Sequence, residues 1–238
     1  MKKHIPNTLT CCNLLSGAVA VWLATEHLYI CALGMIIVGA LFDFCDGLSA
    51  RALNVTSPIG KELDSLADDI TFGLAPAMML FCFLKPIVGY WALIALLMAA
   101  FSALRLAKFN LDERQTSDFI GLATPPNALF WASVVTACQL GKINIDPTRA
   151  TILLVLSLLS CYLLISEIPF FSLKFHSKTW TDNRVRYLFL FCAVIILVSF
   201  AVLSVMSHSW FIISAAPAAI ICIYITIALS VALKKRKS

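Results

Sequence analysis

Residues 43 to 69 read DFCDGLSARALNVTSPIGKELDSLADD and contain an unusual concentration of acids. Six of the thirteen acidic residues of the chain fall here: Asp43, Asp46, Glu62, Asp64, Asp68 and Asp69. The whole chain is 61% hydrophobic and 13% charged, with a mean hydropathy of +0.91. An acid beside an apolar core is strongly unfavourable unless it is paired or binds a cation. The stretch therefore predicts a cation site around which the rest of the fold is organised.

The composition of the other residues indicates a membrane protein. A chain of 238 residues with so few charged side chains cannot cover a soluble surface. Apolar runs close to the length of about 20 residues that a membrane helix needs recur along most of the sequence. We expect an all-α, polytopic integral membrane bundle that forms a single domain over residues 1–238. The net charge of +5 is typical of loops that face anionic lipid, so nucleic acid is not expected as a partner.

Hydropathy and charge together predict eight transmembrane helices. These spans are expected at about residues 11–26, 28–46, 61–83, 87–107, 125–141, 149–171, 186–206 and 210–233. Residues 1–10 are expected along the membrane interface, residues 47–60 as a polar connection, and the last two spans at the periphery.

The distribution of basic residues predicts the orientation of these spans. If the N-terminus is cytoplasmic, 15 of the 18 Lys and Arg residues fall on the cytoplasmic side, leaving only Lys85, Lys142 and Arg149 outside. Both termini and the acidic stretch are therefore predicted to face the cytoplasm, in the cell membrane.

The nine cysteines and four histidines show no spacing that is typical of a metal site. Most of the cysteines fall inside apolar runs, which indicates small buried side chains in a reducing environment. The metal ligands are therefore expected among the acids.

The spacing of the acids predicts two helix ends that aim carboxylates at one point. Asp43 and Asp46 are three positions apart, and Asp64 and Asp68 are four apart, so each pair shares one helix face. Four carboxylates would repel one another unless divalent cations held them, and oxygen ligands favour Mg²⁺ or Mn²⁺. Two such ions can clamp a diphosphate during an in-line displacement. The substrate class implied is a phosphate anhydride.

The residues between the two acid pairs fit a phosphate-binding loop. Gly47, Ala50 and Gly60 are small where a ligand or another helix must approach closely. Arg51 offers a planar guanidinium for phosphate. Asp69 points about 100° away from its neighbour on a helix, which predicts a supporting role rather than direct metal binding.

Two other interpretations of the acidic stretch stay open at this point. The acids could be solvated charges in an interfacial loop, although their helical spacing on both sides of a basic connection argues against this. They could also be the binding site of a divalent-cation or lipid transporter, but transporter acids more often lie at mid-membrane on broken helices. The boundary position favours an enzyme.

The complete pattern resembles the signature of a known enzyme family. The run Asp43-x-x-Asp46-Gly47-x-x-Ala50-Arg51, eight residues, then Gly60-x-x-x-Asp64-x-x-x-Asp68 resembles that of the CDP-alcohol phosphotransferases. The resemblance implies a membrane-embedded, usually homodimeric enzyme that moves a phosphatidyl group from a CDP-linked lipid to an alcohol and releases CMP. It implies that the four aspartates hold two divalent cations and that Asp68 is also the catalytic base. It implies contacts to the CDP-lipid from Asn7, Thr10, Gly47, Ala50, Arg51, Ser57 and Gly60.

Flanking segments resemble the phosphatidylserine synthase branch of that family. The matching pieces are residues 6–17, 64–77, 105–110, 119–125 and 168–175. Ala123 stands where that branch commonly has proline, and Lys108 stands where it has arginine. The branch implies CDP-diacylglycerol and L-serine as substrates.

The residues near position 105 give weaker, independent support for an amino-acid acceptor. Serine carries a carboxylate, so its pocket needs a cation, and this region supplies Arg105, Lys108, Asn110 and Asn127. We predict serine contacts from the first three. The alternative acceptors, glycerol 3-phosphate and inositol phosphate, would require more clustered arginines than the sequence has.

Overall fold

The computed structural model describes residues 4–55, 57–112, 119–170 and 180–237, and within them the chain is almost entirely helical. Residues 171–175 of the last family-like segment lie outside the described residues. The helices are α1 (His4–Thr25), α2 (Tyr29–Leu53), α3 (Pro58–Asp68), α4 (Ala75–Val88), α5 (Leu97–Leu111), α6 (Thr124–Leu140), α7 (Pro147–Ile165), α8 (Trp180–Met206) and α9 (Trp210–Lys237). A π-helical turn, η1 (Asp69–Leu74), joins α3 to α4, and a 3₁₀ segment, η2 (Gly89–Leu96), joins α4 to α5.

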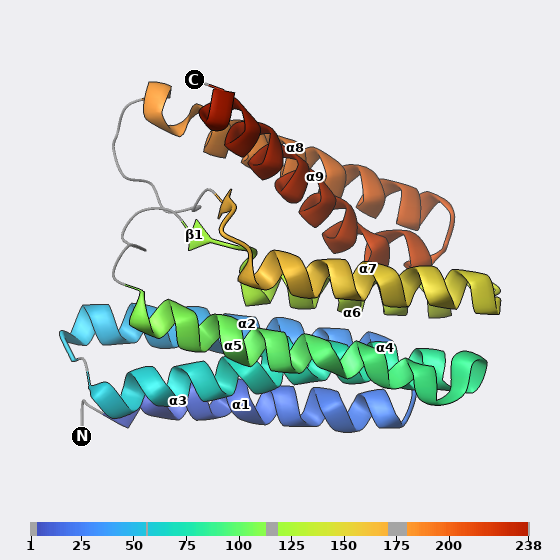
Figure 1. Ribbon diagram of the computed structural model, residues 1–238, viewed down its shortest axis with the longest axis horizontal. Helices are drawn as coiled ribbons and strands as arrows, with labels where there is room; N and C mark the ends of the chain where they lie inside the picture. Colours follow the sequence, from blue (N-terminus) through green and yellow to red (C-terminus); the bar gives the residue numbers. More distant parts are fainter. Residues whose placement is uncertain (1–3, 56, 113–118, 171–179, 238) are drawn as a thin grey trace.

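The first five helices form one layer of the molecule (Figure 1). α1 packs along α2, and α3 continues through η1 into α4, so this segment crosses the layer as one long rod. At Gly89, whose φ of +59° suits glycine, the chain turns back so that α5 lies beside η1. The acid-bearing ends of α2 and α3 therefore lie at the same end of the layer.

The connection between α2 and α3 is shorter than the sequence predicts. α2 continues to Leu53 and ends at Asn54, whose left-handed conformation closes the helix. α3 begins at Pro58, and the residue before it, Ser57, is its N-cap. The Ser57 side-chain oxygen accepts a hydrogen bond from the Gly60 backbone N–H at 3.0 Å. The predicted polar connection over residues 47–60 is thus mostly helix, because these capping signals confine the loop to four residues.

Residues 1–10 also differ from the expectation. α1 begins at His4, so Asn7 and Thr10 belong to the first helix rather than to an interfacial segment. Pro6 lies in the first turn of this helix, where its missing N–H needs no partner. The sixth span was predicted over residues 149–171. It is shorter at its C-terminal end, because α7 stops at Ile165.

A very close approach of three elements fixes η1 in the first layer. A Cβ atom on Gly17 of α1 would lie 2.7 Å from the Cα atom of Thr71. A Cβ atom on Gly39 of α2 would lie 2.6 Å from the Cγ2 atom of the same threonine. The hydroxyl of Thr71 donates to the backbone carbonyl of Asn13 at 2.9 Å. Both glycines are therefore required for the packing of α1 and α2 against the turn that follows Asp68.

The later helices build outward from this layer. In Figure 1, α6 and α7 lie between the first layer and the hairpin of α8 and α9. A short antiparallel pair, β1 (Phe119–Ile120) and β2 (Pro169–Phe170), links the segments before α6 and after α7. Phe170 of β2 packs in a small apolar cluster with Phe189 of α8 and Tyr224 of α9.

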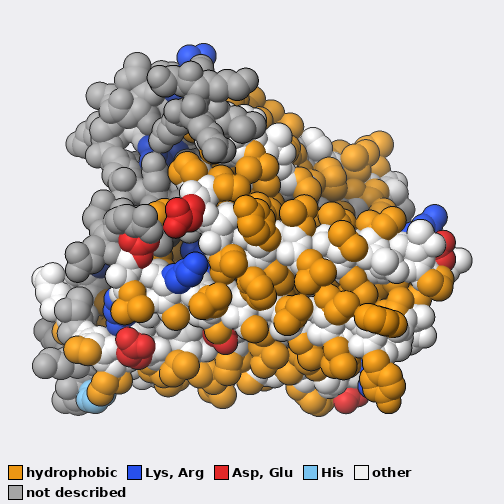
Figure 2. Space-filling view, in the orientation of Figure 1, with side chains coloured by type: hydrophobic (Ala, Val, Ile, Leu, Met, Phe, Trp, Pro, Cys, Tyr) orange, Lys and Arg blue, Asp and Glu red, His pale blue; other side chains and the backbone are white. Residues whose placement is uncertain are grey.

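The length and apolar character of the helices confirm a polytopic membrane bundle. Six helical segments of the described chain are long and apolar enough to cross a membrane, and one of them, Pro58–Leu111, is the segment that turns back at Gly89. Hydrophobic side chains cover most of the face in Figure 2, and more of the charged ones lie toward its left side. The predicted eight crossings and the cytoplasmic termini stay predictions.

Candidate active site

Three carboxylates meet at one end of the first layer. Asp43 comes from α2, while Asp64 and Asp68 come from successive turns of α3, and one oxygen atom of each lies within 4.8 Å of the others. Asp46, one turn after Asp43, is buried and adds its charge to the same region. The helical spacing therefore brings three of the four predicted acids together, with Asp46 one helical turn away from Asp43.

Helix α1 supplies neutral hydrogen-bond donors to this cluster. The hydroxyl of Thr10 donates to Oδ2 of Asp46 at 2.7 Å, and Nδ2 of Asn13 donates to Oδ1 of Asp68 at 3.1 Å. Oδ1 of Asp64 is buried and, within the described chain, has no hydrogen-bond partner. A cluster of oxygen atoms that includes a buried, unpartnered carboxylate oxygen fits a divalent cation such as Mg²⁺ or Mn²⁺.

A cavity of about 560 Å³ opens beside the acids, between α1, α2 and α3. Its lining includes Asp46 and Asp64 together with six of the seven residues that the sequence predicts for the CDP-lipid: Asn7, Thr10, Gly47, Ala50, Ser57 and Gly60. Gly60 could not be replaced without crowding, because a Cβ there would lie 2.9 Å from Oγ of Ser57 and 3.2 Å from Oδ1 of Asn7.

The seventh predicted residue, Arg51, is exposed on the last turn of α2. Its guanidinium lies back along the helix, with Nη1 3.7 Å from where a Cβ on Gly47 would be. It thus stands near the edge of the cavity, where a phosphate-bearing ligand could reach it.

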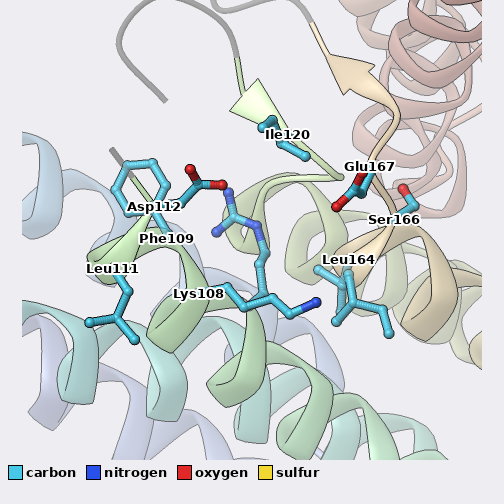
Figure 3. A pocket seen from close by; sticks show the side chains of 10 residues that line it. Lys108, Phe109, Leu111, Asp112, Ile120, Leu164, Ser166 and Glu167 are labelled. Carbon is cyan, nitrogen blue, oxygen red and sulfur yellow. The ribbon is translucent and has the colours of Figure 1, made fainter. Parts of the chain in front are cut away.

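A second cavity, of about 380 Å³, lies between the end of α5 and the segment after α7 (Figure 3). Arg105 and Lys108 line it. Arg105 is buried, donates weakly to the Thr124 hydroxyl at 3.5 Å, and has its guanidinium carbon 5.9 Å from the centre of the Phe109 ring. Its charge interacts with that of Asp68, which links one residue of the cavity wall to the acidic cluster.

Asn110 does not line the second cavity. Its side-chain Nδ2 donates to Oγ of Ser65 at 2.8 Å, and its backbone carbonyl accepts from Nζ of Lys61 at 3.1 Å. These bonds tie the end of α5 to α3 and give Asn110 a structural role in this arrangement.

Asp69 lies apart from the carboxylate cluster, as its position on the helix predicts. Its buried Oδ1 is 2.6 Å from where a Cβ on Gly73 would be, and Ser102 of α5 borders the same point. The glycine therefore leaves room for the carboxylate between η1 and α5.

The sequence interpretation did not give site roles to two residues near the acids and cavities. Asn13 lies two turns after Pro6 and holds Asp68, and it could have been found from its position on the face of α1 that carries Thr10. Glu167 lines the second cavity and directly precedes the family-like segment 168–175, which was matched without giving this acid a role. Asn127, named as a possible acceptor contact, is buried with both polar side-chain atoms unbonded among the described residues.

Comparison with known proteins gives the family. The model of CDP-alcohol phosphatidyltransferase matches residues 3–167, which is more than half of the chain and contains both cavities and the acidic cluster. The chain belongs to the CDP-alcohol phosphatidyltransferase family. This CDP-alcohol phosphatidyltransferase is thus a membrane-embedded transferase of phospholipid biosynthesis, in a family that uses divalent cations, and the predicted resemblance is confirmed.

Several relatives of this CDP-alcohol phosphatidyltransferase carry one name, CDP-diacylglycerol–serine O-phosphatidyltransferase. The protein from Bacillus subtilis is 38% identical over 125 residues, which cover 51% of this chain and 70% of that protein. One from Helicobacter pylori is 34% identical over 128 residues, covering 52% of this chain and 54% of that protein. One from Methanocaldococcus jannaschii is 35% identical over 137 residues, covering 57% of this chain and 61% of that protein.

Proposed function

We propose that this protein transfers the phosphatidyl group of CDP-diacylglycerol to the hydroxyl of L-serine and releases CMP. The observation that carries the proposal is the acidic cluster beside the cavity that holds the predicted CDP-lipid contacts. Asp64 lines the cavity that also holds the predicted CDP-lipid contacts, and Asp68, one turn along α3, acts on Arg105 in the wall of the second cavity. We infer that the donor occupies the first cavity and the acceptor the second, on the side of Arg105.

The residues of the first cavity suit a nucleotide diphosphate. Small residues on α2 and at the start of α3 leave space for the ligand, while Asn7 and Thr10 offer polar groups from α1. Arg51 at the edge of the cavity would bind phosphate oxygens of the leaving CMP. Divalent cations, two in our proposal, would be held by Asp43, Asp46, Asp64 and Asp68, and when bound they would neutralise the diphosphate.

Asp68 is proposed as the catalytic base. Its Oδ1 is engaged by Asn13, which leaves Oδ2 to accept the proton of the serine hydroxyl. The serine oxygen then bonds to the phosphorus on the lipid side, and the bond from that phosphorus to the oxygen of CMP breaks. The products are the phosphatidyl ester of serine and CMP, so atoms and charge balance without an oxidant or reductant.

The choice of serine rests on the second cavity and on the relatives. Arg105 and Lys108, which both line this cavity, offer two positive charges to a carboxylate. The three relatives described above share the serine transferase name at 34–38% identity. A metal or lipid transporter has no need of a nucleotide-sized cavity next to the acids.

We further propose that the active site faces the cytoplasm and that the protein works as a homodimer in the cell membrane. The distribution of Lys and Arg supports the orientation, because 15 of the 18 fall on the side of the acidic stretch. The dimer follows from the family resemblance.

An acceptor panel tests the proposed function. Purified protein in lipid nanodiscs is given CDP-diacylglycerol and Mg²⁺ or Mn²⁺, and CMP release is measured with L-serine, glycerol 3-phosphate or inositol phosphate. We expect release to depend on serine. Release with glycerol 3-phosphate alone would assign another acceptor, and no release with any acceptor would favour the transporter interpretation.

A further inference from the structure

The second cavity has charges of both signs, and they come from opposite walls. Arg105 and Lys108 line it from α5, and Glu167 lines it from the segment that follows α7. In Figure 3, Lys108 and Asp112 lie on the α5 side, whereas Ser166 and Glu167 lie across the cavity from them. A ligand in this cavity therefore meets the cations of α5, with Asp112 beside them, on one side and the Glu167 carboxylate on the other.

The backbone on both sides of Glu167 is held in place. The N–H of Gly121 donates to the carbonyl of Ile168, and the N–H of Leu122 donates to the carbonyl of Leu163, each at 2.9 Å. Gly121 has a φ of +78°, and a Cβ there would lie 2.6 Å from the carbonyl oxygen of Leu164. This close approach requires glycine and fixes the wall from which the Glu167 side chain extends.

The Glu167 carboxylate is available to a ligand. Its side chain is exposed to the cavity, and no hydrogen bond or ion pair engages it within the part of the chain that the structure describes. Asp112, the other acid of the lining, differs because it already has an interaction partner. Glu167 is therefore the better candidate for binding a cationic group.

We propose that Glu167 binds the ammonium group of an amino-acid acceptor and so determines the acceptor specificity of the enzyme. The inference rests on the proposed function and deepens it. L-serine has a hydroxyl, a carboxylate and an ammonium group. The cavity offers the cations of α5 to the carboxylate and Glu167 to the ammonium group. The proposed base for the hydroxyl, Asp68, does not line the cavity, but its charge interacts with Arg105 in the cavity wall. A cavity of about 380 Å³ is large enough for a molecule of this size.

The same carboxylate disfavours the anionic alternatives. Glycerol 3-phosphate and inositol phosphate would fit their phosphate to Arg105 and Lys108 but would have no positive group to offer Glu167. The Glu167 carboxylate would then lie unpaired beside a second anion, and the two negative charges would repel each other. Glu167 thus acts by attraction of serine and by rejection of phosphorylated alcohols.

Two acceptors that differ only in the amino group test the proposal. L-serine and 3-hydroxypropionate share the hydroxyl and the carboxylate, and only serine has the ammonium group. The full-length protein in nanodiscs is assayed for CMP release with serine, and 3-hydroxypropionate is measured as a competitive inhibitor of that reaction. The variants are Glu167→Gln, Asp112→Asn, and Glu26→Gln as the matched control. Glu26 is an exposed acid after α1, remote from the cavity lining.

We expect Glu167→Gln to lower kcat/KM for serine by about 10-fold to 100-fold, since a charged hydrogen bond contributes on this scale. The KM for CDP-diacylglycerol should stay within about twofold. The inhibition constant of 3-hydroxypropionate should stay the same or fall, because this anion has no positive group to lose from Glu167 and is repelled by its charge. Glu26→Gln should match the wild type in every measurement.

Two results for Glu167→Gln would overturn the role of Glu167. One is an equal weakening of kcat/KM for serine and of inhibition by 3-hydroxypropionate. The other is an unchanged kcat/KM for serine. The expected pattern appearing in Asp112→Asn instead would also overturn this role. In all of these cases the wild type still uses serine, so the proposed function stands. A wild type that ignores serine and uses another acceptor refutes the proposed function itself, and the inference with it.

Discussion

Replacing Gly39 by alanine tests how the fold positions the catalytic aspartate. A Cβ at residue 39 would lie 2.6 Å from Cγ2 of Thr71 and 2.9 Å from Oδ1 of Asn13. Non-bonded carbon atoms prefer about 3.5–4.0 Å, so the neighbours would have to move by about 1 Å. The substitution thus acts on two residues that support Asp68 without touching the acids.

Neither neighbour can move freely. The Thr71 hydroxyl donates a hydrogen bond to the Asn13 backbone carbonyl at 2.9 Å. The Cα atom of Thr71 already lies very close to Gly17. The amide of Asn13 is bonded to Asp68 at 3.1 Å. Overpacking of this kind costs about 1–3 kcal/mol of stability. A displacement of about 1 Å in a positioning group can lower turnover by about 100-fold.

The assay compares Gly39→Ala with Gly34→Ala on the same helix. Gly34 is exposed, and a Cβ there would meet nothing within 4 Å, so this control should keep the thermal midpoint and the turnover of the wild type. We expect Gly39→Ala to unfold at a lower temperature in detergent and to lose at least about tenfold in kcat for CMP release. If the two variants behave alike, the packing around Thr71 does not hold Asp68, and our reasoning about this site is wrong.

Three further predictions concern the site directly. Chelation by EDTA should abolish CMP release and Mg²⁺ or Mn²⁺ should restore it; activity that survives exhaustive chelation would contradict a metal role for the acids. Asp68→Asn should reduce turnover to background while CDP-diacylglycerol still binds, as measured with labelled lipid, and near-normal turnover would exclude Asp68 as the base. Arg105→Gln should raise the KM for serine by about 10-fold, through loss of a charged contact, and raise that for the CDP-lipid much less; equal rises would remove Arg105 from the acceptor side.

Local spacing made the acidic cluster predictable from the sequence. The separations of three and four residues guarantee a shared helix face wherever a helix forms, and helices were strongly indicated by the apolar runs. The membrane class followed from composition for the same reason, because it depends on no long-range contact. The bounds of α1 and α2 were less accurate, since caps such as Asn54 act on single residues.

The second cavity was only partly predictable because its walls are distant in sequence. Arg105 and Lys108 were found from their charge beside a span end, but the opposite wall depends on the pairing of β1 with β2 across some fifty residues. No periodic pattern reports such a pairing of two-residue strands. Asn110 illustrates the opposite problem: its side chain is polar and near the site, yet it is bonded to Ser65 on α3.

The π-helical turn of η1 has a consequence for how this protein can vary. A π turn holds one more residue than an α-helix would, and one residue corresponds to about 100° of rotation. The carboxylates of α3 and the apolar face of α4 are therefore set in phase with each other by that one residue. Deleting a single residue from 69–74 should leave a regular α-helix but rotate the carboxylates of α3 relative to the apolar face of α4. The number of residues in this segment should therefore be more tightly constrained than their identity.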